Sequence, residues 1–152
     1  MTIRFRSAQA ADLPVLIAMI AADSLAASRE GAADPDNPAI RAAFEAISAD
    51  PNNDILVAER DGTVIGCLQL TFIPGLTYEG GTRAHIEAVR VAASERGQGI
   101  GQKLVEEAIS RARTKNCALV QLTTDRRRAD AARFFERLGF APNHIGMKLW
   151  LR

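Results

Sequence analysis

The sequence predicts one α+β domain: a mixed, mostly antiparallel, twisted sheet with helices on both faces. Two apolar, strand-like runs in the first half of the chain are joined by a tight turn, which indicates an antiparallel hairpin. Helical periodicity separates the other strand-like runs, and after residue 84 the order becomes strand, helix, strand. A hairpin region followed by a βαβ unit is typical of a mixed sheet that buries both of its faces under helices.

Length and composition narrow the class of protein. A chain of 152 residues fits a single domain that spans 1–152. The formal net charge of +1 predicts neither a nucleic acid nor a membrane surface as partner. The chain has no apolar run of bilayer length and no leader-like core in its first residues, so a cytoplasmic protein is expected. Cys67 and Cys117 lie far apart in apolar runs and there are only two histidines, so no metal site and no disulfide are expected.

The first third of the chain predicts a strand and two helices. Residues 2–6 alternate apolar and basic side chains, as a half-exposed strand does. Residues 12–22 place leucine and isoleucine at helical spacing. After a polar, irregular stretch at 24–38, the pair Asn37-Pro38 has the pattern of a helix N-cap followed by a first-turn proline. The second helix is therefore expected to run from there to about residue 48.

The middle of the chain predicts an antiparallel hairpin and a third strand. The apolar runs at 54–60 and 63–72 are separated only by Asp61-Gly62, a pair that favours a two-residue hairpin turn. A glycine-rich loop at 74–82 and a strand at 84–91 follow.

The last third predicts two helices, each followed by a strand. A helix over 99–115 has its apolar residues on one side. A second helix over 130–138 ends before Gly139, which suits the position after a helix C-terminus. The two strands are expected at 118–123 and at 144–151, the latter with Ile145, Met147, Leu149 and Leu151 on one face.

The stretch ERGQGIGQK, residues 95–103, contains three glycines directly before a predicted helix. Glycines at a helix N-terminus favour a phosphate ligand, because unpaired N–H groups and the helix dipole attract an anion and the missing side chains allow its close approach. A Walker A loop does not fit, since Gln102 and Leu104 stand where a glycine and a Ser or Thr are needed. The dinucleotide pattern G-x-G-x-x-G fails at Gln102 as well. The alternative to a phosphate site is a glycine-rich connection without a ligand.

What does fit is Arg96-x-x-Gly99-x-Gly101 placed after a strand and opening a helix, which resembles the acyl-coenzyme A pyrophosphate loop of GNAT-type N-acetyltransferases. The strand 85–91 resembles the central strand of that family. The run 128–140 is similar to its second signature, N-x-x-A-x-x-[LF]-Y-x-x-x-G-F. The resemblance covers nearly the whole chain. It implies a GNAT-like fold with six or seven strands, a splayed central strand pair, and acetyl-CoA as co-substrate.

The resemblance also implies which residues hold acetyl-CoA. The backbone of the central strand would pair with pantetheine, the glycine loop would hold the pyrophosphate, and the second signature helix would lie beside the thioester. Carried over by position, the coenzyme-binding residues are Val89, Arg90, Val91, Arg96, Gly97, Gln98, Gly99, Ile100, Gly101, Gln102, Arg128, Phe134 and Phe135.

Glu87 is the candidate general base for the acceptor amine, because an alkyl amine with a pKa of about 10.4 is mostly protonated at pH 7. A carboxylate in an otherwise apolar strand is expected to have a role or a partner, so the alternatives are an ion pair with Arg83 or Arg90, or exposure to solvent. His85 is a weaker candidate, on the same strand face if the strand is regular. A backbone N–H near Val89 is the expected oxyanion donor.

The departure from the family pattern is at Phe135, where the family has the tyrosine that protonates the departing thiolate. Three alternatives follow: the thiolate leaves unassisted, Tyr78 from the 74–82 loop supplies the proton, or the protein binds acyl-CoA without turnover. Arg126, Arg127 and Arg128 are expected to form a solvated loop, with contact to a coenzyme phosphate or an acidic substrate as the alternative.

The expected activity is transfer of an acetyl group to a primary amine of a small molecule by direct attack in a ternary complex. The alternatives are a lysine or N-terminal amine of a protein, and a non-catalytic acyl-CoA-binding regulatory module. The acceptor is expected to enter over the 24–38 and 74–82 loops, and acids in the first of these, Asp23, Glu30, Asp34 and Asp36, suit a cationic acceptor. The last strand and the sheet edges are compatible with a homodimer.

Overall fold

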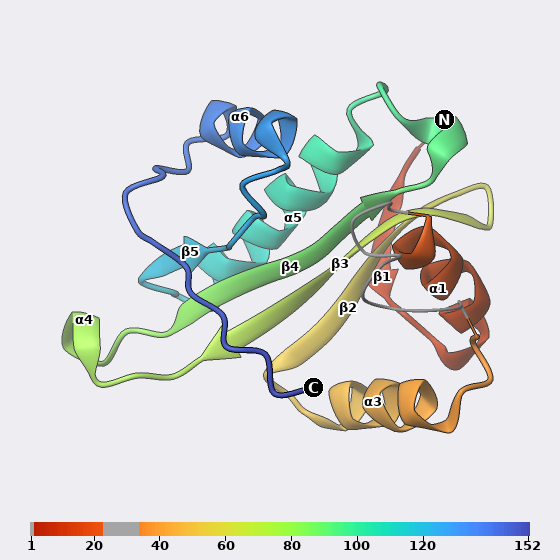
Figure 1. Ribbon diagram of the computed structural model, residues 1–152, viewed down its shortest axis with the longest axis horizontal. Coiled ribbons are helices and arrows are strands. Elements are labelled where there is room, and N and C mark those ends of the chain that lie inside the picture. Colours follow the sequence, from red (N-terminus) through yellow and green to blue (C-terminus); the bar gives the residue numbers. More distant parts are fainter. Residues whose placement is uncertain (1, 23–33) are drawn as a thin grey trace.

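The computed structural model describes residues 2–22 and 34–152, and Figure 1 shows them as a twisted sheet flanked by helices. The sheet has five strands in the order β1-β2-β3-β4-β5. Neighbouring strands are antiparallel from β1 to β4, and β5 runs parallel to β4. The strands are β1 (Arg4–Ser7), β2 (Asn53–Arg60), β3 (Thr63–Ile73), β4 (Arg83–Val91) and β5 (Leu119–Gln121).

The helices cover both faces of the sheet, as the sequence predicts. Helix α5 packs on one face against β2, β3 and β4, whereas α1 packs on the other. Helix α3 lies against β2, and Figure 1 shows α6 beside the first turns of α5. The helices are α1 (Leu13–Ala21), α3 (Pro38–Ala49), α4 (Thr77–Gly80), α5 (Ile100–Thr114) and α6 (Ala129–Arg137), with 3₁₀ turns at Ala10–Asp12 and Ala93–Glu95.

Local signals place two boundaries where the sequence predicts them. The Asn37 side chain accepts a hydrogen bond of 2.9 Å from the N–H of Ala39, so Asn37 is the N-cap of α3 and Pro38 its first residue. Asp61 and Gly62 have φ angles of 51° and 79°, the left-handed pair that a two-residue hairpin turn between β2 and β3 requires.

The core lies between the sheet and α5. Side chains alternate along the central strands, so that one set meets α5 and the other meets α1. Leu56 and Ala58 belong to the α5 side and Val57 to the α1 side. The buried residues of α5 recur at helical spacing along one side of the helix: Ile100, Leu104, Val105, Ala108 and Ala112.

The expected strand at 144–151 is wrong for this chain: residues 138–152 form no helix or strand, and the sheet has five strands rather than six or seven. Alternation of apolar residues predicts which side chains share a face, but a strand also needs a neighbouring strand to satisfy its backbone. Within the described residues this segment has no such neighbour. Figure 1 shows it running as an extended chain from α6 to the C-terminus.

Candidate active site

Strand β4 contains a bulge at Ala88. Along the β3–β4 ladder, β3 advances by two residues from Cys67 to Gln69 while β4 moves by three from Arg90 to Glu87, so β4 carries one extra residue. Ala88 has a φ of 54°, a left-handed conformation that is rare for a residue other than glycine. Strain of this kind is found mainly at functional sites, because the surrounding structure must hold it in place. The sequence analysis missed this bulge, since an alanine gives no local signal for it.

The bulge changes which residues of β4 face α5. Before it, Ala84 and Ile86 belong to the core on the α5 side. After it, Val89 and Val91 pack on that side, whereas a regular strand would send them to the opposite face. His85 and Glu87 therefore lie on the face away from α5. The sequence predicts that these two residues share a face.

Glu87 is half-exposed, with 49% of its side chain accessible, and its Oε2 lies 3.8 Å from His85 Nε2. Because Glu87 is not buried, its carboxylate needs no ion-pair partner. Its exposure agrees with the alternative that Glu87 faces solvent. Gln121 Nε2 lies 3.4 Å from His85 Nδ1, which accepts this hydrogen bond in the tautomer that has no proton on Nδ1.

Polar side chains continue across the same face of the sheet. Gln69 stands opposite Glu87 in the ladder, and Thr71 stands opposite His85. Both of these β3 side chains donate to Asn53 Oδ1, Gln69 over 3.3 Å and Thr71 over 2.7 Å. The result is a polar row across β2, β3, β4 and β5 that can position a polar substrate over Glu87. The sequence analysis missed Asn53, Gln69, Thr71 and Gln121, because only the ladder brings them together.

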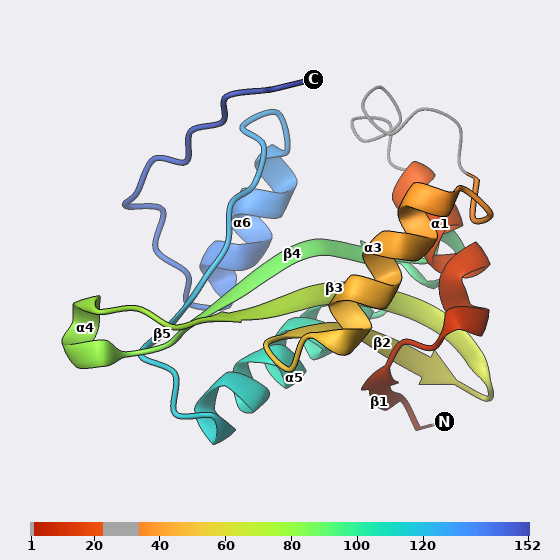
Figure 2. The ribbon, with the colours of Figure 1, turned by 90° about the horizontal axis from the view of Figure 1, so that it is seen from below.

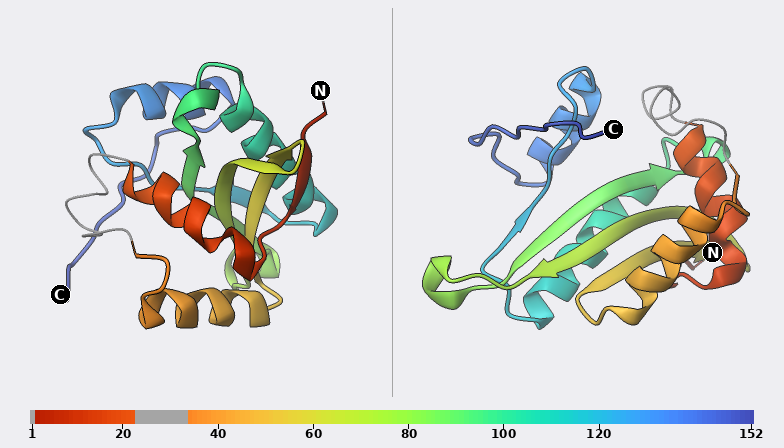
Figure 3. Two further views of the ribbon diagram at one scale, coloured as in Figure 1. Left: turned by 90° about the vertical axis from the view of Figure 1, so that its right-hand side faces the viewer. Right: turned by 60° about the horizontal axis from the view of Figure 1, so that its bottom comes forward.

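β4 and β5 separate after a short pairing. Their ladder joins Arg83 to Leu119 and ends with His85 opposite Gln121. From Ile86 to Val91, β4 has no strand on this side among the described residues. Figure 3 shows the chain after β5 turning away from β4 toward α6. The gap leaves the edge of β4 available for hydrogen bonds to an extended ligand.

The glycine-rich residues 96–101 before and at the start of α5 (the glycine turn) lie at the end of this gap where β4 and β5 are unpaired. Gly99 is the N-cap of α5 with φ 79° and ψ 13°, a conformation that favours glycine. The first helical hydrogen bond runs from Lys103 N to Gly99 O, so the N–H groups of the preceding turn have no intrahelical acceptor. Arg96, Gly97 and Gln98 are exposed, whereas Ile100 is buried and fixes the helix start.

Gly101 stands where the turn, β4 and α6 meet. A Cβ atom at this position would lie 3.6 Å from both Val91 Cγ2 and Phe134 Cζ. The missing side chain therefore opens space between the end of β4 and α6. Three of the predicted coenzyme residues, Val91, Gly101 and Phe134, are thus brought together by the fold.

The other predicted coenzyme residues border this junction. Arg96 Nε donates to the carbonyl of Val91 over 3.4 Å, and Arg90 Nη1 donates to the carbonyl of Val89 over 2.9 Å. Gln102 donates to Glu106 along the exposed side of α5. Arg128 immediately precedes α6, and the neighbouring Arg127 is paired with Asp125 at 2.7 Å.

Phe135 has a structural role at the end of α6. The N–H groups of Gly139 and Phe140 bond to the carbonyls of Glu136 and Phe135, which is the Schellman pattern that the sequence predicts at Gly139. The rings of Phe135 and Phe140 pack edge-on at 5.8 Å, the apolar contact that accompanies this cap. Phe135 also packs edge-on against Phe134 at 5.0 Å.

Tyr78 lies apart from these residues. It belongs to α4, at the tip of the β3–β4 connection, and 58% of it is exposed. The adjoining Gly81 approaches Ala118, just before β5. Helix α4 therefore lies at the end where β4 and β5 are paired, opposite the gap. Residues 24–33 of the other predicted acceptor loop lie outside the described residues, and of its acids Asp36 pairs with Arg41 at 2.8 Å.

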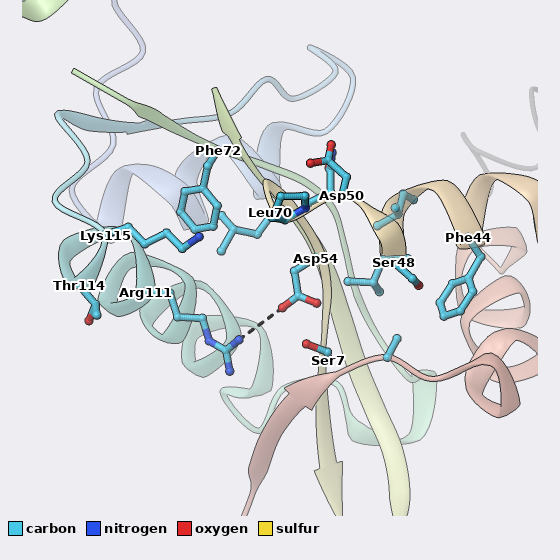
Figure 4. A pocket seen from close by; sticks show the side chains of 15 residues that line it. Ser7, Phe44, Ser48, Asp50, Asp54, Leu70, Phe72, Arg111, Thr114 and Lys115 are labelled. Carbon is cyan, nitrogen blue, oxygen red and sulfur yellow. Dashed lines mark hydrogen bonds and ion pairs between the residues drawn. The ribbon is translucent and has the colours of Figure 1, made fainter. Parts of the chain in front are cut away.

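A cavity of about 610 Å³ opens between the C-terminal ends of α3 and α5, away from β4 (Figure 4). Asp54 and Arg111 form an ion pair of 3.3 Å in its wall. No residue of β4 or of the glycine turn lines it. Of the polar row described above, only Asn53 borders this cavity, and the chemistry of the β4–β5 gap and the glycine turn marks the candidate site.

Two other kinds of site find no support in residues 2–22 and 34–152. No cluster of three or more His, Cys, Asp or Glu side chains in these residues could hold a metal ion. Among their helices, none has both the length and the apolarity needed to cross a bilayer.

Comparisons with known proteins agree with this geometry. Residues 19–140 match the profile of the Acetyltransferase (GNAT) family. The chain is 34% identical over 110 residues to an aminoalkylphosphonate N-acetyltransferase of Salmonella typhimurium, covering 72% of this chain and 71% of that protein. It is 33% identical to a glucosamine 6-phosphate N-acetyltransferase of Trypanosoma brucei, over 58% of each chain. A solved structure of a transcriptional regulator from Bacillus halodurans is 42% identical and superposes with a TM-score of 0.93, covering 99% of this chain and 100% of that one.

Proposed function

Because the chain belongs to the GNAT family of acetyltransferases, we propose that it transfers the acetyl group of acetyl-CoA to a primary amine of a small molecule. The observation that carries this proposal is the junction of the glycine turn with the β4–β5 gap. Gly101 leaves space beside Val91 and Phe134, directly at the N-terminus of α5. A phosphate group suits the helix N-terminus, and an extended amide-bearing arm suits an unpaired strand edge.

The residues around this junction fit acetyl-CoA. The exposed backbone of Arg96–Gly99 and the first turn of α5 would hold the pyrophosphate, with the positive end of the helix dipole behind it. The edge of β4 at Val89 and Val91 would pair with the pantetheine amides. When bound there, acetyl-CoA supplies a thioester whose acyl carbon is attacked by the amine.

Glu87 is the proposed base. Removing a proton from an alkyl amine of pKa about 10.4 at pH 7 costs about 4.6 kcal/mol, so a positioned acceptor for that proton accelerates the reaction. Its half-exposed carboxylate faces away from α5 within the polar row, where a small amine can reach it directly or through a water. His85 Nε2 lies 3.8 Å from Glu87 Oε2, too far for a direct hydrogen bond, so His85 would act on this carboxylate through a bridging water.

The bulge supports Val89 as the proposed source of the oxyanion donor. Ala88 and Val89 have no ladder partner on β3, and β5 does not reach this level of β4. A backbone N–H that is free of the ladder and fixed by the strand is the kind of donor that stabilises a developing oxyanion.

The thiolate is proposed to leave without a protein acid. A thiol with a pKa of about 8.5 costs about 2 kcal/mol to release as thiolate at pH 7, a small part of an enzymatic barrier. Phe135 has no proton to give, and Tyr78 lies at the end where β4 and β5 are paired. The variant Phe135→Tyr is therefore expected to change kcat by less than about threefold. A rise of tenfold or more would show that proton donation limits the native enzyme.

A small-molecule acceptor is favoured by two curated relatives, which are named for amines that carry a phosphonate or a phosphate. A non-catalytic acyl-CoA-binding module remains the second candidate function. Two observations favour it: Phe135 replaces the family tyrosine, and the solved relative at 42% identity is named a transcriptional regulator.

Calorimetric titration with acetyl-CoA, with ATP and NAD as controls, tests the first step. Micromolar binding of acetyl-CoA alone is expected, and its absence would overturn both candidate functions. Release of free thiol with a panel of amines, including aminoalkylphosphonates and glucosamine 6-phosphate, then separates an enzyme from a regulatory module.

The variant Glu87→Gln tests the proposed base. It is expected to lower kcat by about 100-fold while leaving acetyl-CoA affinity within about threefold, because the carboxylate acts on the amine and not on the coenzyme. The matched control is Glu45→Gln on the exposed side of α3, which should leave both values unchanged. Equal activity of the Glu87→Gln variant and the native protein would exclude Glu87 as the base.

A further inference from the structure

Arg83 is a half-buried cation for which the acetyl-transfer chemistry above has no use. It is the first residue of β4, and its Nε atom is buried without a hydrogen-bond partner in the described part of the chain. A guanidinium keeps its proton at every pH that a folded protein tolerates, so burial cannot be relieved by deprotonation. A buried N–H of a charged group therefore needs an acceptor to offset the cost of leaving water.

Four other half-buried arginines show what Arg83 lacks. Arg6, Arg60 and Arg111 each pair with a carboxylate, at 2.8, 2.7 and 3.3 Å. Arg90 donates to a backbone carbonyl over 2.9 Å. Within residues 2–22 and 34–152, Arg83 is the one of these five without an ion pair or a hydrogen bond from its side chain. The fold thus provides a cation at the start of β4 and leaves its anion to come from a ligand.

Arg83 lies on the same face of the sheet as the proposed base. Ala84 and Ile86 face α5, so the alternation of the strand places Arg83, His85 and Glu87 on the opposite face. In Figure 2, α5 lies below β3 and β4, and this opposite face is the upper one. An acceptor that reaches Glu87 from solvent therefore lies over the face that carries Arg83.

The surroundings of Arg83 favour an anion. In the two ladders Arg83 stands opposite Ile73 of β3 and Leu119 of β5, and both of these apolar residues are half-buried. Apolar neighbours keep water away from the guanidinium, and in the lower dielectric an opposite charge is attracted more strongly than in water. The polar row described above thus ends in a desolvated cation.

The distance between Arg83 and Glu87 suits one small molecule. Four residues of extended strand separate their Cα atoms by about 13 Å. The Glu87 carboxylate is turned toward His85, which lies between the two, with 3.8 Å between Oε2 and Nε2. The interval that remains between the two charged groups is therefore shorter than the Cα distance, and an acceptor with an amine at one end and an anion at the other can meet both.

We propose that Arg83 binds a phosphonate or phosphate group of the acceptor while the acceptor's amine lies at Glu87. This inference rests on the proposed function, because it names the class of acceptor for the same acetyl transfer. A guanidinium offers a planar fork of N–H donors that matches the oxygens of such a group, and the unpaired Nε of Arg83 belongs to that fork. The contact would fix which end of the acceptor approaches the thioester.

The selectivity of the native protein gives the first test and needs no variant. Release of free thiol from acetyl-CoA is measured with 2-aminoethylphosphonate against ethanolamine and β-alanine, and with glucosamine 6-phosphate against glucosamine. In at least one of the two sets, kcat/KM should be about 30-fold or more higher for the phosphonate or phosphate. Equal values in both sets, or a preference for the carboxylate of β-alanine, would overturn the inference.

The variant Arg83→Gln assigns the selectivity to this side chain. It should lower kcat/KM for the preferred acceptor by about 30-fold, mainly through KM, and leave the neutral analogue and the affinity for acetyl-CoA within about threefold. Arg83→Lys, which keeps the charge and loses the fork, should recover part of the loss. The matched control is Arg113→Gln, exposed on α5 at the other face of the sheet, which should leave all values within about threefold. Equal losses for the charged and the neutral acceptor would show a structural role instead.

The same measurements separate this inference from the proposed function. Turnover of ethanolamine and 2-aminoethylphosphonate at equal rates would leave the acetyltransferase proposal standing and overturn the role of Arg83. If no amine releases thiol, the proposed function fails, and calorimetric titration of the CoA-bound protein with 2-aminoethylphosphonate and glucosamine 6-phosphate tests Arg83 alone. Binding of either one that weakens by about 30-fold in Arg83→Gln would support the anion site, whereas no binding, or equal affinity in both proteins, would exclude it.

Discussion

The two sides of β4 are built differently. On the side of β3, the ladder follows β4 along almost its whole length, and the strands beyond it share a buried core with α1 and α5. On the side of β5, the ladder ends at His85, and α6 contributes no buried residue. We call the first the closed side (β1–β4, α1 and α5) and the second the open side (β5, α6 and residues 141–152).

The comparison shows how one strand can serve stability and binding at once. The closed side fixes β4, its bulge and the start of α5 through fully buried side chains such as Ile86, Ile100 and Leu104. The open side leaves backbone groups of β4 available for a ligand. Binding groups held by a rigid neighbour lose little conformational entropy on binding, which favours affinity.

The largest difference between the two sides should appear on truncation of a leucine. Leu104→Ala on α5 removes a side chain that is 0% exposed, and it should lower the free energy of unfolding by about 2–5 kcal/mol. Leu138→Ala at the end of α6 removes a partly buried side chain and should lower it by about 1 kcal/mol. Denaturant unfolding of both variants measures the contrast, and equal losses would contradict the division into a closed and an open side.

A second test separates binding from folding at the boundary of the two sides. Gly101→Val should lower the affinity for acetyl-CoA about tenfold or more, or about 1.4 kcal/mol, because its methyl groups fill the space beside Val91 and Phe134. For Gly101→Ala the melting temperature should hardly change, since contacts at 3.6 Å leave room for its Cβ atom. Gly101→Ala should act in the same direction but less. Unchanged affinity in both variants, measured by calorimetry, would place the coenzyme elsewhere.

An effect of similar size, on stability rather than on binding, concerns the outer strand of the closed side. The Asp12 carboxylate accepts hydrogen bonds from Arg6 at 2.8 and 3.1 Å and from the N–H of Gln9 at 2.7 Å. The bonds with Arg6, more than that with Gln9, lower the pKa of Asp12 in the folded protein. Asp12→Asn should therefore cost about 1.5 kcal/mol of stability near pH 7.

The lowered pKa fixes the sign of the pH dependence. The contribution of Asp12 is complete above its unfolded pKa, near 3.9, and is lost as the pH falls through the lower folded value. The stability difference between the native protein and Asp12→Asn should thus shrink below about pH 4. Asp36→Asn, which removes an exposed ion pair with Arg41, should show no measurable difference at any pH. A constant gap for Asp12→Asn down to pH 2 would contradict the assignment.

Features with a local cause were predictable from the sequence. Asn37-Pro38, Asp61-Gly62 and Gly139 each specify a cap or a turn within a few residues, and the structure has all three where expected. The glycine turn was predictable for the same reason, because the motif and the helix that it opens are contiguous.

Features that depend on distant residues were not predictable. The bulge at Ala88 arises because β4 has one residue more than β3 over the same stretch of their ladder. Nothing in the local sequence around an alanine indicates it. The segment 144–151 has the alternation of a strand but lacks a partner in its own chain. The polar row through Asn53, Gln69 and Gln121 depends on the register of four strands, which a single sequence does not specify.

The extra residue at Ala88 has a consequence for insertions and deletions. With Ala88 as the extra residue, Val89 follows Ile86 on the α5 face after three residues instead of two. Deleting Ala88 would therefore leave Val89 and Val91 facing α5 in a regular strand, and it would remove only the bulge with its left-handed residue. The core should tolerate that deletion, whereas the oxyanion donor proposed beside the bulge should be lost with it.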